Sequence, residues 1–152
     1  MKLAEALLIR SDMQRKLSSL RERITSNTLV QESDQPSEDP NALLAEAEAI
    51  IERLQKIIYA INEANFTGRT SKGRTLTQAL AERDTLQLRH SILKATANSA
   101  ASQPDRYGTR EIRWVRIVDV VALQQAADQA AQALRDLNAE IQEANWKVEL
   151  TV

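Results

Sequence analysis

Two arginines occupy positions that the hydrophobic pattern of the chain otherwise gives to apolar side chains. Arg10 and Arg83 each interrupt a series of apolar residues spaced three and four apart. A guanidinium group in a helical core needs a partner, because an unpaired buried charge costs several kcal/mol. The partners that the sequence offers lie in a repeated Glu-Ala-Asn-aromatic motif, and they are Glu63, Asn65, Glu143 and Asn145.

Two interpretations of these six residues remain open. In the first, they meet at one end of a helical bundle and form a paired polar layer, which could also hold a small ligand. In the second, both arginines extend to the edge of the bundle and the Asn residues cap the C-terminal ends of their helices. The sequence favours the second interpretation slightly.

Other catalytic or metal chemistry has little support in the sequence. The chain has one histidine and no cysteine. A di-metal site in a four-helix bundle uses paired Glu-x-x-His motifs, whereas His90 has no partner at metal-ligand spacing. Phosphate-binding loops, dinucleotide turns, zinc motifs and Ser-His-Asp patterns are also absent from the sequence. We therefore expect no metal and no cofactor, and we assign no catalytic residues. Catalysis by carboxylates alone stays open, and the sequence favours a protein that is not an enzyme.

The elements that position the polar residues form an internal repeat. Residues 61–66 read Ile-Asn-Glu-Ala-Asn-Phe and residues 141–146 read Ile-Gln-Glu-Ala-Asn-Trp. Each copy ends a long helical pattern that begins after an Asp N-cap, Asp39 or Asp119. The chain is thus predicted to be one domain, 1–152, in which a helical hairpin occurs twice, at 1–70 and 75–150. The four helices are expected at 3–26, 40–66, 76–98 and 120–146.

The second helix has the widest apolar face. Its seam residues, at spacings of three and four, are Leu43, Ala47, Ile50, Leu54, Ile57 and Ile61. Leu44, Ile51 and Ile58 widen this stripe. A stripe of this width can be buried on two sides, against the bundle and against another subunit. It predicts coiled-coil-like packing and a homo-oligomer.

The connections between helices carry a second set of candidates. Residues 112–118 are β-branched and partly alternating, which predicts a strand, and this strand could pair with residues 28–31. Basic and aromatic residues surround it, namely Arg106, Tyr107, Trp114 and Arg116. Such residues can bind single-stranded nucleic acid, or they can form a protein interface with an acidic loop at 32–39. A net charge of −1 favours the protein interface.

The predicted fold is therefore all-α: an antiparallel four-helix bundle made of two repeated hairpins, with a small β-ribbon in the inter-helix connections. No apolar run approaches the ~18 residues of a membrane-spanning helix, and the N-terminus does not resemble a signal peptide. We expect a cytoplasmic protein that binds neither nucleic acid nor membrane.

Six short motifs together resemble one family of small bacterial helical proteins, often labelled septicolysin-like. They lie at 3–7, 38–40, 76–84, 105–107, 118–120 and 142–146. The resemblance covers essentially the whole chain, and the family label implies a membrane-active cytolysin. It transfers no catalytic residues. The residues themselves favour a non-enzymatic helical protein that works through self-association and protein interaction. The alternatives are the membrane-active protein and a bundle that binds a small ligand at its Arg/Glu/Asn end.

Overall fold

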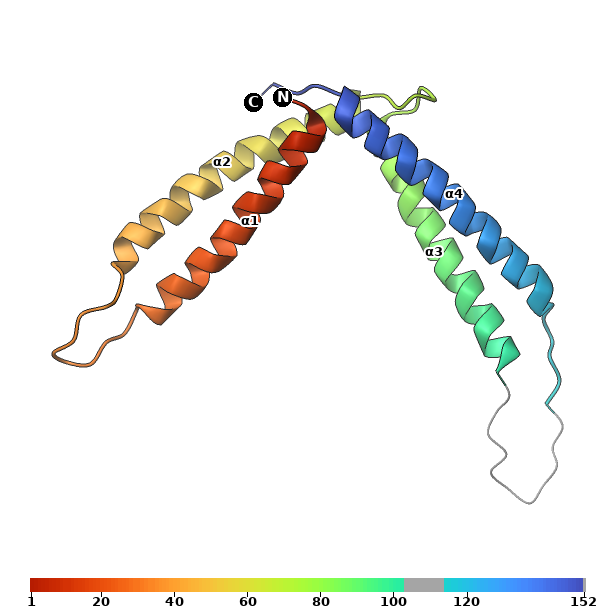
Figure 1. The fold of residues 1–152 in the computed structure, drawn as a ribbon, viewed down its shortest axis with the longest axis horizontal. Helices are drawn as coiled ribbons and strands as arrows, with labels where there is room; N and C mark the ends of the chain where they lie inside the picture. The colour runs from red at the N-terminus through yellow and green to blue at the C-terminus, as the bar shows by residue number, and fades with distance from the viewer. Residues whose placement is uncertain (103–113, 152) are drawn as a thin grey trace, which may run out of the picture. The chain divides into compact units, whose positions relative to one another are not determined.

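The computed structural model of the chain describes residues 1–102 and 114–151, and these residues are all-α (Figure 1). Four helices are found in this part of the chain: α1 (Leu3–Ser26), α2 (Pro40–Thr67), α3 (Leu76–Ala101) and α4 (Val120–Lys147). They fall into two compact units. The first unit contains Met1–Leu76 and Gln142–Val152, and the second contains Thr77–Ile141.

The helices begin where the sequence predicts and end within three residues of the predicted positions. The Asp39 carboxylate accepts a hydrogen bond from Asn41 N at 2.9 Å, and Pro40 fills the first helical position. Asp119 Oδ1 accepts from Ala122 N at 3.0 Å and so caps α4. Each cap satisfies one of the amide groups that a helix start leaves without an intrahelical acceptor.

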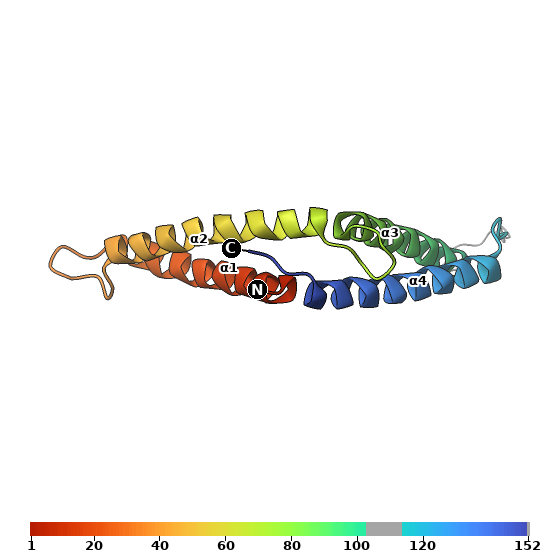
Figure 2. The same cartoon turned by 90° about the horizontal axis from the view of Figure 1, so that it is seen from above.

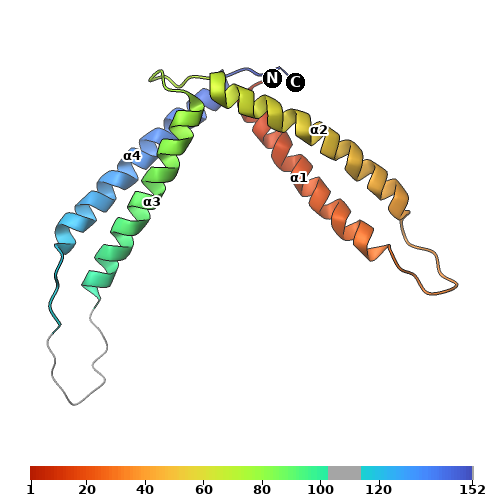
Figure 3. The same ribbon diagram turned by 180° about the vertical axis from the view of Figure 1, so that it is seen from behind.

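In the first unit, α1 and α2 run antiparallel side by side, as all three ribbon views agree (Figures 1, 2 and 3). The core between them is built on Leu20, Leu43 and Ile50, all of which are buried. Met13, Leu17, Ile24 and Ala47 pack around these three. This core follows from the three-and-four spacing of both helices, which places one apolar stripe on each.

The connection between α1 and α2 is fixed by polar contacts. The buried Asn27 side chain donates to Arg23 O at 2.9 Å and accepts from Ser37 Oγ at 2.9 Å and Glu38 N at 3.2 Å. The Arg23 guanidinium forms an ion pair with Glu38 and donates to it from Nε at 2.9 Å. These contacts close the loop over the end of α1.

The two ends of the chain pair with each other in the first unit, and their labels lie close together in Figures 1 and 3. Leu3 N donates to Val148 O at 2.9 Å, and Leu150 N donates to Met1 O at 2.9 Å. Lys2 Nζ also donates to the Glu149 carboxylate at 2.5 Å. This pairing holds residues 148–151 against the start of α1.

In the second unit, α3 and α4 lie side by side (Figures 1 and 2). Four of the buried side chains described in this unit are alanines, and the others are larger. The alanines are Ala79, Ala97, Ala127 and Ala130, and the larger side chains are Leu137, Glu140 and Ile141. Alanine at these positions allows helix backbones to approach closely.

The predicted β-ribbon is not present among the described residues. Neither residues 28–31 nor residues 114–118 form a strand, and the rest of the predicted strand, 112–113, lies outside the described part. The bridges that do form are isolated, between Lys2 and Glu149 and between Arg69 and Thr75. Leu29 and Ile117 are 90% and 94% exposed. The β-branched composition of these segments is therefore not sufficient to form a strand, because a strand also needs a neighbouring backbone to pair with.

Candidate functional site

The six predicted polar residues have different environments. In the first unit, Arg10 is half-buried, and its Nε atom is buried without a hydrogen-bond acceptor among the described residues. Glu143 is exposed and pairs with Lys147 one helical turn along α4. Glu63 is exposed, whereas Asn65 is half-buried and has an interaction partner. Asn145 is buried, with 7% of its surface exposed.

Arg83 lies in the second unit and pairs with its neighbour in sequence. Its guanidinium donates to Asp84 Oδ1 from Nε at 3.0 Å and from Nη2 at 2.8 Å. A surface ion pair of this kind contributes little to stability. The polar layer that would join Arg83 to the Glu-Ala-Asn motifs stays a prediction.

The predicted interface candidates lie partly within the described residues. Trp114 is 76% exposed, and Arg116 Nε donates to Ala100 O at 2.8 Å. Arg106 and Tyr107 lie outside the described residues. The contact of Arg116 ties the segment before α4 to the end of α3.

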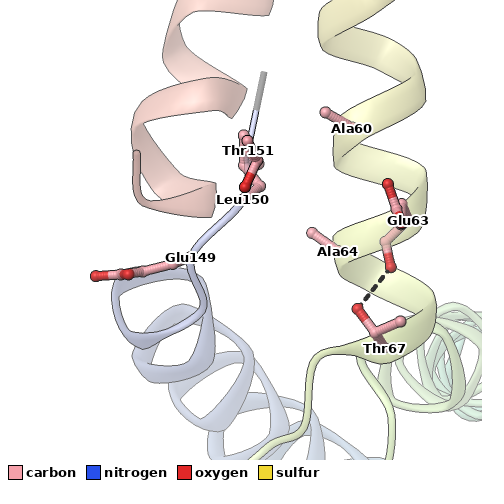
Figure 4. Close-up of a pocket in the computed structure, with 7 residues that line it drawn as sticks. All are labelled: Ala60, Glu63, Ala64, Thr67, Glu149, Leu150 and Thr151. Carbon is pink, nitrogen blue, oxygen red and sulfur yellow. Dashed lines mark hydrogen bonds between the residues drawn. The ribbon is translucent and has the colours of Figure 1, made fainter.

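A shallow pocket of about 200 Å³ lies between the end of α2 and the C-terminal residues of the chain (Figure 4). Glu63 and Glu149 both line it, which raises the question of a catalytic carboxylate pair. In Figure 4, however, the Glu149 carboxylate points away from the α2 side chains, and Lys2 binds it. A general acid and base must both reach the same substrate atoms, so this arrangement does not support carboxylate catalysis.

Two carboxylates have pKa values that are shifted by a basic partner. Hydrogen bonding by Arg23 lowers the pKa of Glu38 below its ordinary value. Hydrogen bonding by Lys2 lowers the pKa of Glu149 in the same way. Both pairs hold connections closed, the first beside α1 and the second at the chain ends, so their role is structural.

One apolar feature of the first unit is a row of three side chains on α2, here called the α2 stripe. Leu44, Ile51 and Ile58 are 46%, 48% and 37% exposed. These are the residues that widened the apolar face in the sequence. They lie beside the buried row Leu43, Ile50 and Ile57, which packs toward α1. The stripe therefore extends the hydrophobic core to the surface.

Sequence reasoning missed two residues that organise the first unit. Asn27 directly follows the helix predicted at 3–26, and it makes the three hydrogen bonds that close the loop after α1. Gly68 lies just after the helix predicted at 40–66, and a Cβ atom there would lie 2.5 Å from Ala64 O. An Asn directly after a predicted helix C-terminus was the available signal for the first. The contact of Gly68 with Ala64 O is local, and a glycine near a predicted helix C-terminus is its signal. Its contact with Val148 depends on tertiary structure and has no such signal.

The described residues contain no cluster of three or more His, Cys, Asp or Glu side chains placed to bind a metal ion. Within that same part of the chain, none of the helices combines the length and apolar character needed to cross a membrane.

Comparison with known proteins places the chain in a family. A family model described as a family of unknown function, DUF6847, matches residues 10–150. The chain is also similar to the crystal structure of a functionally unknown conserved protein from Corynebacterium diphtheriae. That likeness has a TM-score of 0.91 and 37% sequence identity, and it covers 99% of each chain. No curated protein matched. The chain thus belongs to the family of unknown function DUF6847.

Proposed function

We propose that this chain is a non-enzymatic helical protein that works through self-association and protein interaction, with the α2 stripe as its contact surface. The observation that carries the proposal is the exposure of Leu44, Ile51 and Ile58 at intervals of seven residues. Two turns of an α-helix contain about seven residues, so the three side chains form one row. A row of this kind matches the packing seam of another helix.

The sequence of α4 supports a role for the stripe beyond the folding of the helix. When the Glu-Ala-Asn motifs are aligned, the seam residues Leu54 and Ile61 match Leu134 and Ile141, so the seam stays apolar. The stripe does not, since its three residues match Gln124, Ala131 and Asn138. Nevertheless α4 forms a helix of the same length, 28 residues. A helix of this pattern therefore forms without apolar residues at the stripe positions.

An ion pair between α1 and α2 lies on the side of the helix pair away from the stripe. Lys16 Nζ binds the Glu46 carboxylate at 2.6 Å. Glu46 follows Leu44 by two residues, which places it about 200° around the helix from Leu44. The ion pair thus closes the opposite side of the α1–α2 pair, and the stripe side stays open to a partner.

The expected affinity of the stripe alone is modest. Full burial of a Leu or Ile side chain contributes about 1.5–3 kcal/mol, so three side chains already half-buried would contribute roughly 3 kcal/mol per copy. Association itself costs about 4–15 kcal/mol. We therefore expect an oligomer that depends on protein concentration, with neighbouring contacts along α2 adding to the stripe.

The proposal also includes four features of architecture, assembly and location that the sequence predicts. They are the repeat at 1–70 and 75–150 within one domain, the antiparallel four-helix bundle, and a homo-oligomer located in the cytoplasm. The β-ribbon would then form only on association. The resemblance to septicolysin-like proteins supports one alternative, a membrane-active protein, and release of dye from liposomes at micromolar protein tests it.

The test of self-association replaces the stripe with the residues that α4 carries at matching positions. The variant is Leu44→Gln, Ile51→Ala, Ile58→Asn. A matched control places the same three residue types one position later, as Ala45→Gln, Glu52→Ala, Tyr59→Asn, where all three sites are exposed. Light scattering after size exclusion should give an oligomer for the parent and control and a monomer for the stripe variant. A parent that stays monomeric at ~300 µM, where even a Kd in the range of transient contacts would be detected, would overturn the proposal.

A further inference from the structure

A second, separate feature of the first unit has the properties of a small-molecule site. A pocket of about 260 Å³ lies between the start of α1 and the end of α4. Its lining residues are Ala4, Leu7, Leu8, Gln142, Asn145 and Trp146. All six belong to the first unit, and none carries a charge. The walls are aliphatic and aromatic, with two amide side chains among them.

Asn145 is the most informative of these residues. It is 93% buried, since only 7% of its surface is exposed. Within the described part of the chain, no hydrogen bond or other interaction of its side chain is found, although it lines the pocket. Its amide is not among the side-chain groups of the described residues that are fully buried without a partner, so it keeps some contact with solvent. Its counterpart in the repeated motif, Asn65, does have an interaction partner. The unpartnered amide is thus particular to the α4 copy.

Trp146 supplies the second element of the site. An indole ring is a large apolar surface with one hydrogen-bond donor. Here it is 56% exposed at the pocket, and Leu8 from α1 is 60% exposed beside it. A flat ligand could therefore lie against the indole and the leucine side chains. The motif carries Phe66 at the matching position of α2, so the donor is also specific to α4.

We propose that this pocket binds a neutral planar ligand with a carboxamide or cyclic-amide edge. The Asn145 amide offers one donor and one acceptor side by side, which pair with the acceptor and donor of another amide. The ring of the ligand would lie on Trp146 and the aliphatic wall. Anionic ligands fit less well, because no cationic side chain lines the pocket.

This site is independent of the α2 stripe. The stripe lies on α2, whereas the pocket is lined by α1 and α4. Ligand binding can therefore be measured in the stripe variant, and loss of self-association would leave it unchanged. Failure of one proposal does not affect the other.

The test uses the fluorescence of Trp146. The chain has two tryptophans, so Trp114→Phe leaves Trp146 as the single reporter. Benzamide and nicotinamide serve as probes, and benzoate, with the same ring as benzamide but a carboxylate, serves as the control ligand. We expect a saturable change with the amides and at least tenfold weaker binding of benzoate. A change that rises linearly with probe concentration would indicate collisional quenching and overturn the proposal.

Variants assign the effect to Asn145. Asn145→Leu should weaken benzamide binding at least tenfold, while Asn62→Leu, the same change at an exposed α2 position, should have no effect. Asn145→Asp, which keeps the shape but loses the donor, provides the same binding test if the Leu variant fails to fold. Unchanged benzamide binding in a folded Asn145 variant would refute the assignment.

Discussion

Substitution of Gly68 by alanine should destabilise the first unit by steric conflict. A Cβ atom there would lie 2.5 Å from Ala64 O and 3.0 and 3.1 Å from the two Cγ atoms of Val148. Overpacking of this kind costs about 1–3 kcal/mol, and the gain from a stiffer unfolded chain offsets about 0.4–1 kcal/mol of it. Ala64 O cannot withdraw freely, because it accepts the 2.7 Å hydrogen bond from Gly68 N that ends α2.

We therefore expect a net loss of about 1–2 kcal/mol, or roughly 2–8 °C in the thermal midpoint for a chain of this size. Urea unfolding followed by circular dichroism measures it. Val148→Ala removes two of the three contacts, so the double variant should lose less stability than the sum of the single variants. Gly73→Ala is the control: it is strained by a φ of +83° but has nothing within 4 Å, so Val148→Ala should not rescue it. A Gly68→Ala protein as stable as the parent would refute the steric argument.

Three further predictions concern the effects of substitutions on the stability of the first unit. Asn27→Leu should cost about 1–3 kcal/mol in urea unfolding, because Ser37 Oγ and Glu38 N lose their acceptor and Arg23 O loses a donor; no loss would contradict a structural role. Leu20→Ala should cost about 2–5 kcal/mol as a core cavity, whereas Leu29→Ala at an exposed site should stay within about 0.5 kcal/mol, and equal losses would mean that the core is misplaced. Because Arg23 lowers the pKa of Glu38, that carboxylate stabilises the fold above its ordinary pKa of 4.5, and the contribution is lost as pH falls through the lower folded value. The stability difference between the parent and Glu38→Gln should therefore shrink below about pH 4, and a constant difference would contradict this assignment.

The helices were predictable because their signals are local. Asp39 with Pro40, and Asp119 before an apolar series, mark helix starts through hydrogen bonds within one turn. The three-and-four spacing of Leu43, Ile50 and their neighbours likewise fixes which face is buried. The α2 stripe was visible in the sequence for the same reason.

The rest depended on contacts between residues distant in the chain. The β-branched segments could not be assigned as strands without knowing which backbone lies beside them. The motif pointed to Asn145, but not to its burial without a partner, since only the pocket formed by α1 and α4 reveals that. The predicted polar layer of Arg10 and Arg83 also could not be settled from the sequence, because the pairing of these arginines with Glu and Asn side chains depends on tertiary geometry.

Self-association through the α2 stripe is tested most directly by thiol protection. The chain has no cysteine, so Ile51→Cys places a single thiol in the stripe, and Glu52→Cys places one about 100° around the same helix. Alkylation rates are measured for both at increasing protein concentration. We expect the Ile51→Cys thiol to become protected as concentration rises, while the Glu52→Cys thiol reacts at a constant rate. Equal, concentration-independent rates at both positions would contradict the α2 stripe as the contact surface.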